Sequence, residues 1–253
     1  ADGIVLFNRI KPHTSFRGEY ESGLLKMLAI GLAKHKGAEM VHSLRYNNMA
    51  RNMAEMGSSA LAKLNTVFGV GTIEDAFGKV AELHVLQKDE IREREPALLK
   101  KAWAYMPRIY LDDIDVLIVS EIGKEISGTG MDTNIVGRFH THSASGGPNT
   151  TMLGALDLTD ASEGNANGMG LADFITRRFY EKIDFEASYL NTLTSTEPNS
   201  TKTPTMLDDD ELVIKACVKL SGKLNRDDVR LAMIKNTKQL DTIYLSKAAD
   251  EAV

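Results

Sequence analysis

The sequence has a single cysteine, Cys217, among its 253 residues. One thiol cannot form a disulfide within the chain, and it cannot hold an iron–sulfur cluster, which needs several cysteines. The sequence contains no apolar run of about 18 residues, the length that a membrane-spanning helix requires. The given sequence also does not open on the basic and then apolar pattern of a signal peptide. We therefore expect a cytoplasmic protein that has no membrane partner.

Basic residues are too few for a nucleic-acid-binding surface. The chain has 30 Lys and Arg against 35 Asp and Glu, which gives a net charge of −5 at pH 7. This balance argues against a nucleic-acid partner. With 43% hydrophobic and 26% charged residues, the composition is that of a globular chain and excludes extensive disorder.

The chain begins without methionine. Ala1-Asp2-Gly3 leads directly into the strand-like run Ile4-Val-Leu-Phe7. Because proteins seldom begin inside a buried strand, we expect a fragment that lacks the N-terminal part of a longer protein. A processed start is the alternative.

Apolar runs of strand type alternate with segments of helical period. The expected strands are residues 4–7, 66–70, 81–86, 108–111, 116–120 and 152–158. The expected helices are residues 21–35, 38–56, 89–105, 170–183, 186–193 and 208–220. This alternation predicts an α/β fold.

A domain boundary is predicted near residues 106–114. Met106-Pro107 ends a helix, and the acidic link Leu111–Ile114 precedes an apolar strand. We expect two lobes, residues 1–112 and residues 113–253, with mixed sheets flanked by helices and an active site at the lobe interface.

Histidines are natural candidates for metal binding and proton transfer. His140-Thr-His142 lies in a Gly/Ser-rich stretch, and two such ligands would suit a zinc- or iron-dependent hydrolase. No third ligand follows at a convincing spacing. This hydrolase is one alternative function.

Three residues near the amino terminus form a second candidate group. His13 follows the first strand, at the carboxyl end where α/β sheets present their ligand sites. Lys26 lies inside an otherwise apolar segment, where a lysine must extend to water, pair or react covalently. His42 also lies among apolar neighbours.

The sequence resembles the nickel-pincer-dependent lactate racemase family, in particular an uncharacterised isomerase branch. Three segments carry the resemblance: NRIKPHTSFRGEYESGLLK (residues 8–26), GLAKHKG (residues 31–37) and DVLIVSEIGK (residues 115–124). Ser22-Gly-Leu-Leu-Lys26 stands where the family has Ser-Gly-Gly-x-Lys.

The resemblance implies a role for each of the three residues. Lys26 would be the covalent tether of the nickel-pincer nucleotide, a pyridinium dithio mononucleotide that binds nickel. His42, sixteen positions after Lys26, would ligate the nickel, and His13 would be a catalytic acid/base. The lobe of residues 1–112 would then carry the cofactor. The family's second catalytic histidine lies upstream of this chain, so the chain alone is expected to be inactive.

The implied activity is racemisation or epimerisation of a 2-hydroxy acid. A hydride leaves the substrate for the pyridinium ring and returns to either face, while acid/base groups move the hydroxyl proton. The expected partners are the small hydroxy acid and the enzymes that synthesise the cofactor. A non-catalytic binding relative is a further alternative.

Two cations are candidates for binding the substrate carboxylate. Lys124 and Arg138 bracket the Gly-rich loop Ser127–Asp132, which follows an expected buried strand. Loops after strands commonly supply such contacts, and the guanidinium group of Arg138 suits a bidentate one. The alternative is that both are solvated loop charges.

On one unbroken helix, Lys26 and His42 would lie about 24 Å apart, because each residue adds about 1.5 Å along the axis. We therefore also expect Gly31 and Gly37 to break the helix between them.

Overall fold

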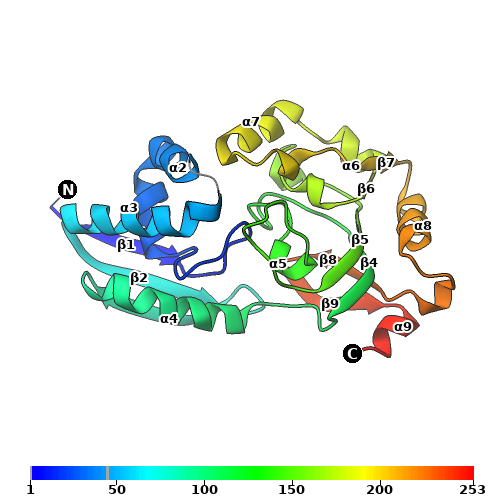
Figure 1. Ribbon diagram of the computed structural model, residues 1–253, viewed down its shortest axis with the longest axis horizontal. Coiled ribbons are helices and arrows are strands. Elements are labelled where there is room, and N and C mark those ends of the chain that lie inside the picture. Colours follow the sequence, from blue (N-terminus) through cyan, green and yellow to red (C-terminus); the bar gives the residue numbers. More distant parts are fainter. Residues whose placement is uncertain (1, 44–45) are drawn as a thin grey trace. The chain divides into compact units, whose positions relative to one another are not determined.

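The computed structural model describes residues 2–43 and 46–253, which fold as an α/β protein with two mixed sheets flanked by helices (Figure 1). The chain divides into two compact units. Unit 1 comprises Ala1–Pro107, Thr141–Ala144 and Thr194–Thr196, and unit 2 comprises Arg108–His140, Ser145–Leu193 and Glu197–Val253. The predicted fold class is therefore confirmed. No helix of the described residues is long and apolar enough to cross a membrane.

Unit 1 is built on a three-stranded sheet of order β1-β2-β3, in which β1 is parallel to β2 and β3 is antiparallel to it. Its strands and helices are β1 (Ile4–Arg9), α1 (Leu24–Lys26), the π-helix η1 (Met27–Leu32), α2 (Lys34–His42), the 3-10 turn η2 (Tyr46–Asn48), α3 (Met49–Lys63), β2 (Thr66–Glu74), β3 (Val80–Gln87) and α4 (Glu90–Tyr105).

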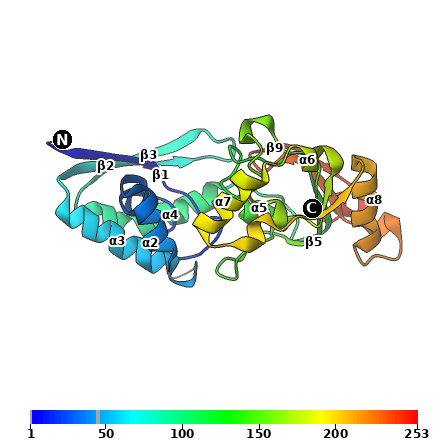
Figure 2. The same ribbon diagram turned by 90° about the horizontal axis from the view of Figure 1, so that it is seen from above.

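One face of this sheet packs on the core of unit 1. Figure 2 shows α2, α3 and α4 on one side of β1, β2 and β3. The buried side chains of this core come from the sheet, from α1 and η1, and from α3 and α4; they include Leu6, Leu24, Leu25, Leu28, Leu61, Ile73, Leu86, Ile91 and Leu98. Alternation of side chains along the strands leaves the other face exposed.

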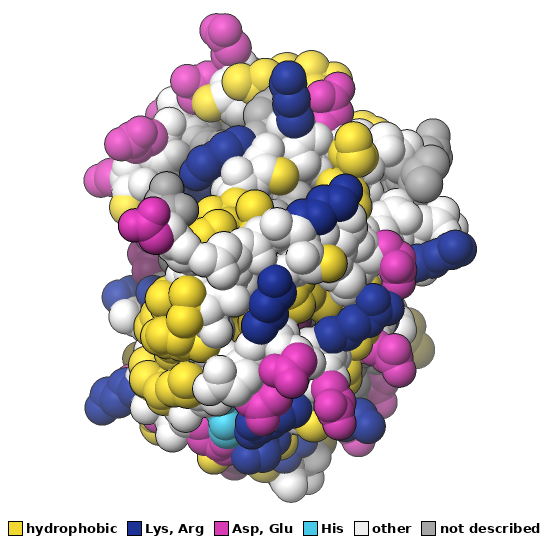
Figure 3. All heavy atoms as spheres, turned by 90° about the vertical axis from the view of Figure 1, so that its left-hand side faces the viewer, with side chains coloured by type: hydrophobic (Ala, Val, Ile, Leu, Met, Phe, Trp, Pro, Cys, Tyr) yellow, Lys and Arg dark blue, Asp and Glu magenta, His cyan; other side chains and the backbone are white. Residues whose placement is uncertain are grey.

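The exposed face of the sheet is apolar. Val5 and Phe7 of β1 are 52% and 61% exposed, and Leu83 and Val85 of β3 are 58% and 53% exposed. Figure 3 views the molecule from the left-hand side of Figure 1 and shows hydrophobic side chains grouped among charged ones. Sheets with parallel strands are usually covered on both faces, so this exposed apolar face is unusual.

Helix α4 continues through Pro96 without interruption. Proline has no N–H, so the carbonyl four residues earlier, that of Arg92, loses its helical partner. The Tyr20 hydroxyl donates to this carbonyl at 2.7 Å. The helix therefore tolerates Pro96, and the free carbonyl becomes an attachment point for the segment that precedes α1.

Unit 2 contains a six-stranded sheet of order β7-β6-β5-β4-β8-β9, parallel except for β9. Its strands are β4 (Asp113–Val119), β5 (Asn149–Ala155), β6 (Phe174–Thr176), β7 (Thr205–Leu207), β8 (Leu231–Asn236) and β9 (Gln239–Leu245). Its helices and 3-10 turns are α5 (Thr133–Val136), η3 (Asp160–Ser162), η4 (Met169–Leu171), α6 (Arg177–Glu181), α7 (Phe185–Ser195, whose last two residues belong to unit 1), η5 (Pro198–Thr201), α8 (Asp210–Leu220), η6 (Arg226–Asp228) and α9 (Lys247–Asp250).

Two segments differ from the sequence-based expectation. Residues 108–111 form no strand, and the expected helix over residues 170–183 contains the strand β6 before the short helix α6. All three residues of β6 are buried. A buried strand of only three residues is too short to show a period that distinguishes it from a helical segment.

Close packing of α3 on α1 requires a glycine at position 57. A β-carbon on Gly57 would lie 2.6 Å from the backbone oxygen of Leu25. We predict that Gly57→Ala lowers the free energy of unfolding by about 1–3 kcal/mol, because the two helices must move apart. Urea denaturation measures this change. Gly128→Ala is the control, since a β-carbon there would meet nothing within 4 Å; an equal loss in both variants would contradict the packing argument.

Candidate functional site

His13 lies in a loop that leaves β1 and returns to α1. The ends of this loop are joined by two backbone hydrogen bonds, from Lys11 N–H to the Ser22 carbonyl at 2.9 Å and from Ser22 N–H to the Lys11 carbonyl at 3.2 Å. Inside the loop, the Glu21 carboxylate accepts from the backbone N–H of His13 at 2.6 Å and from that of Gly18 at 3.3 Å. Glu21 is 2% exposed, and burial raises its pKa. The loop is thus organised around a buried carboxyl group.

The His13 ring is held on two sides. It stacks on Phe16 with ring centroids 4.2 Å apart, and its Nδ1 accepts from the Ser15 backbone N–H at 3.1 Å. A neutral ring in this position carries its proton on Nε2. Burial lowers the pKa of His13 well below its usual value, and the positive charges of Lys26 and Lys11 lower it further. His13 is therefore neutral at pH 7.

Lys26 lies where helix α1 passes into the π-helix η1, in an apolar part of unit 1. π-Helical turns are rare and occur frequently at functional sites. Burial lowers the pKa of Lys26 to about 8, and the charge of Lys11 adds to the effect. Its amine makes no hydrogen bond or ion pair with any described residue. About half of this amine is therefore an unprotonated nucleophile at pH 8, far more than for an ordinary lysine.

The chain turns between Lys26 and His42, as expected, but neither expected glycine makes the turn. Gly31 lies inside η1 and Gly37 inside α2. The direction changes at Lys34, whose φ of 56° is in the left-handed region. Helix α2 then runs back along η1 and ends at His42.

The His42 ring is a candidate metal ligand. Its Nδ1 is buried and has no hydrogen-bond partner among the described residues, while the ring hydrogen-bonds to the backbone of Ser195. Burial lowers the pKa of His42, the charge of Lys26 lowers it further, and the Ser195 bond opposes both. Metal-binding histidines commonly use one nitrogen for the metal and the other for a backbone or carboxylate partner.

His13, Lys26 and His42 lie close enough to influence one another's charge. Lys26 and His42 both lower the pKa of His13, and Lys26 lowers that of His42. Both imidazoles are thus kept neutral near pH 7, and the amine loses its proton at a lower pH than an ordinary lysine. Unit 1 brings together the three residues that the sequence singled out, as a nucleophilic amine and two imidazoles.

The two candidate carboxylate anchors lie in unit 2 and differ in their surroundings. The Lys124 amine donates to the carbonyl of Gly128 at 3.0 Å and to the side-chain oxygen of Asn191, and burial lowers its pKa. No carboxylate of the described residues pairs with it. A ligand carboxylate bound to the Lys124 amine would therefore supply the negative charge that the described residues do not.

Arg138 is already engaged by the protein. Its guanidinium group forms an ion pair with Asp173 at 2.8 Å and donates to the backbone carbonyls of Thr150, Thr151 and Leu171. These bonds tie β5 to the segment before β6. Binding of a substrate carboxylate by Arg138 stays a prediction that requires some of them to be exchanged.

The His140–His142 pair offers little metal-binding chemistry. His140 is 7% exposed, and burial lowers its pKa to about 4, whereas His142 is exposed. No group of three or more His, Cys, Asp or Glu side chains in the described ranges could hold a metal ion. Neither observation supports the alternative hydrolase. A metal ion that is held by one protein side chain together with a bound cofactor would not require such a group of three side chains.

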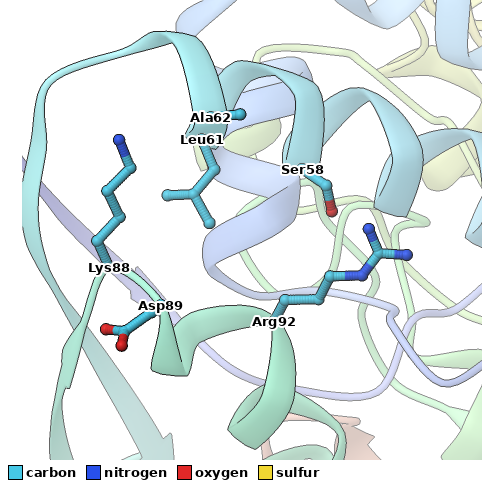
Figure 4. Close-up of a pocket in the computed structure, with 6 residues that line it drawn as sticks. All are labelled: Ser58, Leu61, Ala62, Lys88, Asp89 and Arg92. Atoms are coloured by element: carbon cyan, nitrogen blue, oxygen red, sulfur yellow. The ribbon is translucent and has the colours of Figure 1, made fainter.

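A separate pocket of about 580 Å³ lies between α3 and the start of α4 (Figure 4). Both cationic side chains of its lining are bound by protein groups: Lys88 donates to the Leu64 carbonyl at 2.9 Å, and Arg92 pairs with Glu55 at 3.0 Å. None of the residues singled out from the sequence lines this pocket; the lining residues are Ser58, Leu61, Ala62, Lys88, Asp89 and Arg92.

Sequence reasoning missed the buried carboxyl groups of unit 1. Glu21 organises the His13 loop, and Glu95 of α4 contacts the first turn of the Lys26 helix. Both stand among charged or polar neighbours in the sequence, as solvated residues do. Only the Glu95-Pro96 pair inside a helical segment is a local irregularity that could have drawn attention.

Comparisons of the chain with protein-family models, with curated proteins and with solved structures find no match. The assignment of chemical roles therefore depends on the sequence motifs and on the geometry of His13, Lys26 and His42. The strongest part of that geometry is the Lys26 amine, which is withdrawn from water and forms no ion pair with the residues that the structure describes.

We predict that Lys26→Met stabilises the protein. With a pKa of about 8 in the folded chain and about 10.5 in the unfolded one, Lys26 costs roughly 3 kcal/mol of stability below pH 8. This cost disappears as the pH rises from 8 to 10.5, because the unfolded chain then also loses the proton. Urea unfolding of Lys26→Met should thus show a gain of about 2–3 kcal/mol at pH 7 that shrinks above pH 8.

Lys63→Met is the matched control for this experiment, since Lys63 is exposed on α3. It should change stability by less than about 0.5 kcal/mol. A Lys26→Met variant that is no more stable than wild type at pH 7 would show that the amine is not withdrawn from water.

Proposed function

We propose that this protein is an isomerase that racemises or epimerises a 2-hydroxy acid, using a nickel-pincer nucleotide attached to Lys26. The observation that carries the proposal is the convergence of Lys26, His13 and His42 in unit 1, where burial lowers the pKa of the Lys26 amine to about 8. The resemblance of residues 8–26 to the lactate racemase family supplies the chemical class.

The residues present fit this cofactor. Lys26 offers an amine whose pKa of about 8 leaves part of it unprotonated and able to form a covalent link. His42 offers a buried ring nitrogen that has no hydrogen-bond partner among the described residues. When bound, the cofactor would supply sulfur donors, a nickel ion and a pyridinium ring that accepts and returns a hydride. The only cysteine is not needed as a ligand, and burial raises the pKa of the Cys217 thiol to about 12.

His13 would contact the oxygen on C2 of the substrate. With its proton on Nε2, the neutral ring donates a hydrogen bond, which favours the keto form of that oxygen. To take the hydroxyl proton at Nε2 instead, the ring must carry its own proton on Nδ1, and the bond from the Ser15 N–H must open. The low pKa of His13 keeps the ring neutral and makes its protonated form a strong acid.

The covalent link tests the proposal directly. Produced together with the cofactor-synthesis enzymes, the wild-type chain should gain the mass of the nucleotide at Lys26 and hold about one nickel per chain. Lys26→Arg should keep the unmodified mass, because a guanidinium group cannot form the link. Once loaded, the chain or a version extended at its amino terminus should convert one enantiomer of a 2-hydroxy acid into the other, as followed by chiral chromatography. If Lys26 stays unmodified in both the given chain and the extended version, this function is excluded.

His42→Ala tests the metal ligand separately. We predict that this variant loses most of its nickel and keeps the mass increase at Lys26, because the tether and the ligand are different residues. Metal analysis and intact mass measure the two effects. His84→Ala is the control, because His84 lies on β3 and pairs with Glu82 at 2.7 Å. The His84→Ala variant should retain its nickel. Full nickel content in His42→Ala would assign the ligand to another residue.

A further inference from the structure

The helix that carries Lys26 begins without a local cap. Gly23 precedes it in an extended conformation, with φ −174° and ψ −154°, and provides no side chain to accept from the first N–H groups. These groups have no partner inside the helix and are costly when buried. Leu24 and Leu25, which carry them, are fully buried. The first turn therefore needs an acceptor from elsewhere in the fold.

Glu95 of α4 provides this acceptor. Its Oε2 accepts from the backbone N–H of Leu24 at 2.9 Å and from that of Leu25 at 3.2 Å. Glu95 is 1% exposed, and its other carboxyl oxygen, Oε1, is buried without a partner among the described residues. A carboxyl group with one unsatisfied oxygen is expensive to bury, and Glu95 is nevertheless placed against these two N–H groups.

Gly23 makes room for the carboxyl group. A β-carbon at this position would lie 2.3 Å from Glu95 Oε1 and 2.6 Å from its Cδ. The carbonyl of Gly23 is fixed as well, because it accepts from the side-chain amide of Asn8 at 2.7 Å and from the Met27 N–H at 3.1 Å. The peptide group that joins Gly23 to Leu24 is thus fixed at its carbonyl by Asn8 of β1 and at its N–H by Glu95 of α4.

We propose that Glu95 is a positioning residue for Lys26: its carboxyl group anchors the first turn of the Lys26 helix and so keeps the amine withdrawn from water. The chemistry assigned to that amine rests on the proposed function, but the anchoring does not. If the first turn frays, Lys26 gains access to water and its pKa returns toward the ordinary lysine value.

The alternative is a purely electrostatic role. A negative charge on Glu95 would stabilise the ammonium form of Lys26, so its removal by any substitution would lower the pKa of Lys26. Anchoring predicts the opposite sign for a truncated side chain and no change for an isosteric acceptor. Burial raises the pKa of Glu95 to about 7, so the carboxyl group is largely ionised at pH 8, where the comparison is made.

The experiment measures the apparent pKa of Lys26 in the cofactor-free chain. The rate of acylation of Lys26 by an N-hydroxysuccinimide ester is followed from pH 6.5 to 10.5 by peptide mass spectrometry. The variants are Glu95→Ala, which removes the acceptor, and Glu95→Gln, which keeps one carbonyl oxygen for the two N–H groups. Glu93→Ala, an exposed residue of the same helix, is the matched control. Gly23→Ala displaces the carboxyl group without removing it.

We expect the apparent pKa of Lys26 to rise by at least one unit in Glu95→Ala and in Gly23→Ala, with acylation at pH 8 reduced about fivefold or more. Glu95→Gln and Glu93→Ala should stay close to wild type. If Glu95→Ala does not fold, Gly23→Ala and Glu95→Gln decide the question. A pKa of Lys26 that is unchanged in the truncated variants, or equally lowered in Glu95→Ala and Glu95→Gln, would overturn the proposal. Failure of cofactor attachment would contradict the proposed function and would leave this measurement unaffected.

Discussion

The withdrawal of the Lys26 amine from water is the constraint on which the rest of unit 1 depends. Lowering the pKa of a lysine to about 8 costs roughly 3 kcal/mol at neutral pH, a large share of the about 5–15 kcal/mol by which a domain is stable. Such a cost persists only if the surrounding core contributes enough to offset it. The packing of α1 against α3 and the sheet supplies that contribution, and it also places the amine beside two imidazoles.

The electrostatic arrangement of the site follows from the same constraint. His13 and His42 lie near a lysine that has no carboxylate partner among the described residues, and the charge of Lys26 disfavours the protonated form of both rings. The two neutral rings and the unprotonated fraction of the amine are reactive toward electrophiles and metal ions, whereas three cations would only bind anions. Burial is the largest cause of each shift, and mutual repulsion adds to it.

Much of the fold could be predicted from the sequence because its main signals are local. The apolar run of β1, the strand β4 and the helices α4 and α8 have clear periods and boundaries. The short buried strand β6 has no such signal, and its segment was expected to be a helix.

Some residues of the candidate site could be predicted from the sequence and others could not. His13, Lys26 and His42 stand out by residue type and spacing, but the contact of Glu95 with Leu24 joins residues 71 positions apart. In the sequence Glu95 belongs to a charged run that looks solvated, and only tertiary packing makes it a buried acceptor.

The Glu95-Pro96 pair has a consequence for how unit 1 can move. Glu95 holds the start of the Lys26 helix, and the missing N–H of Pro96 leaves the Arg92 carbonyl free to hold Tyr20, next to the carboxyl group that organises the His13 loop. One helix therefore carries the attachments of both the Lys26 helix and the segment that closes the His13 loop. A substitution that displaces α4 would disturb both attachments at once.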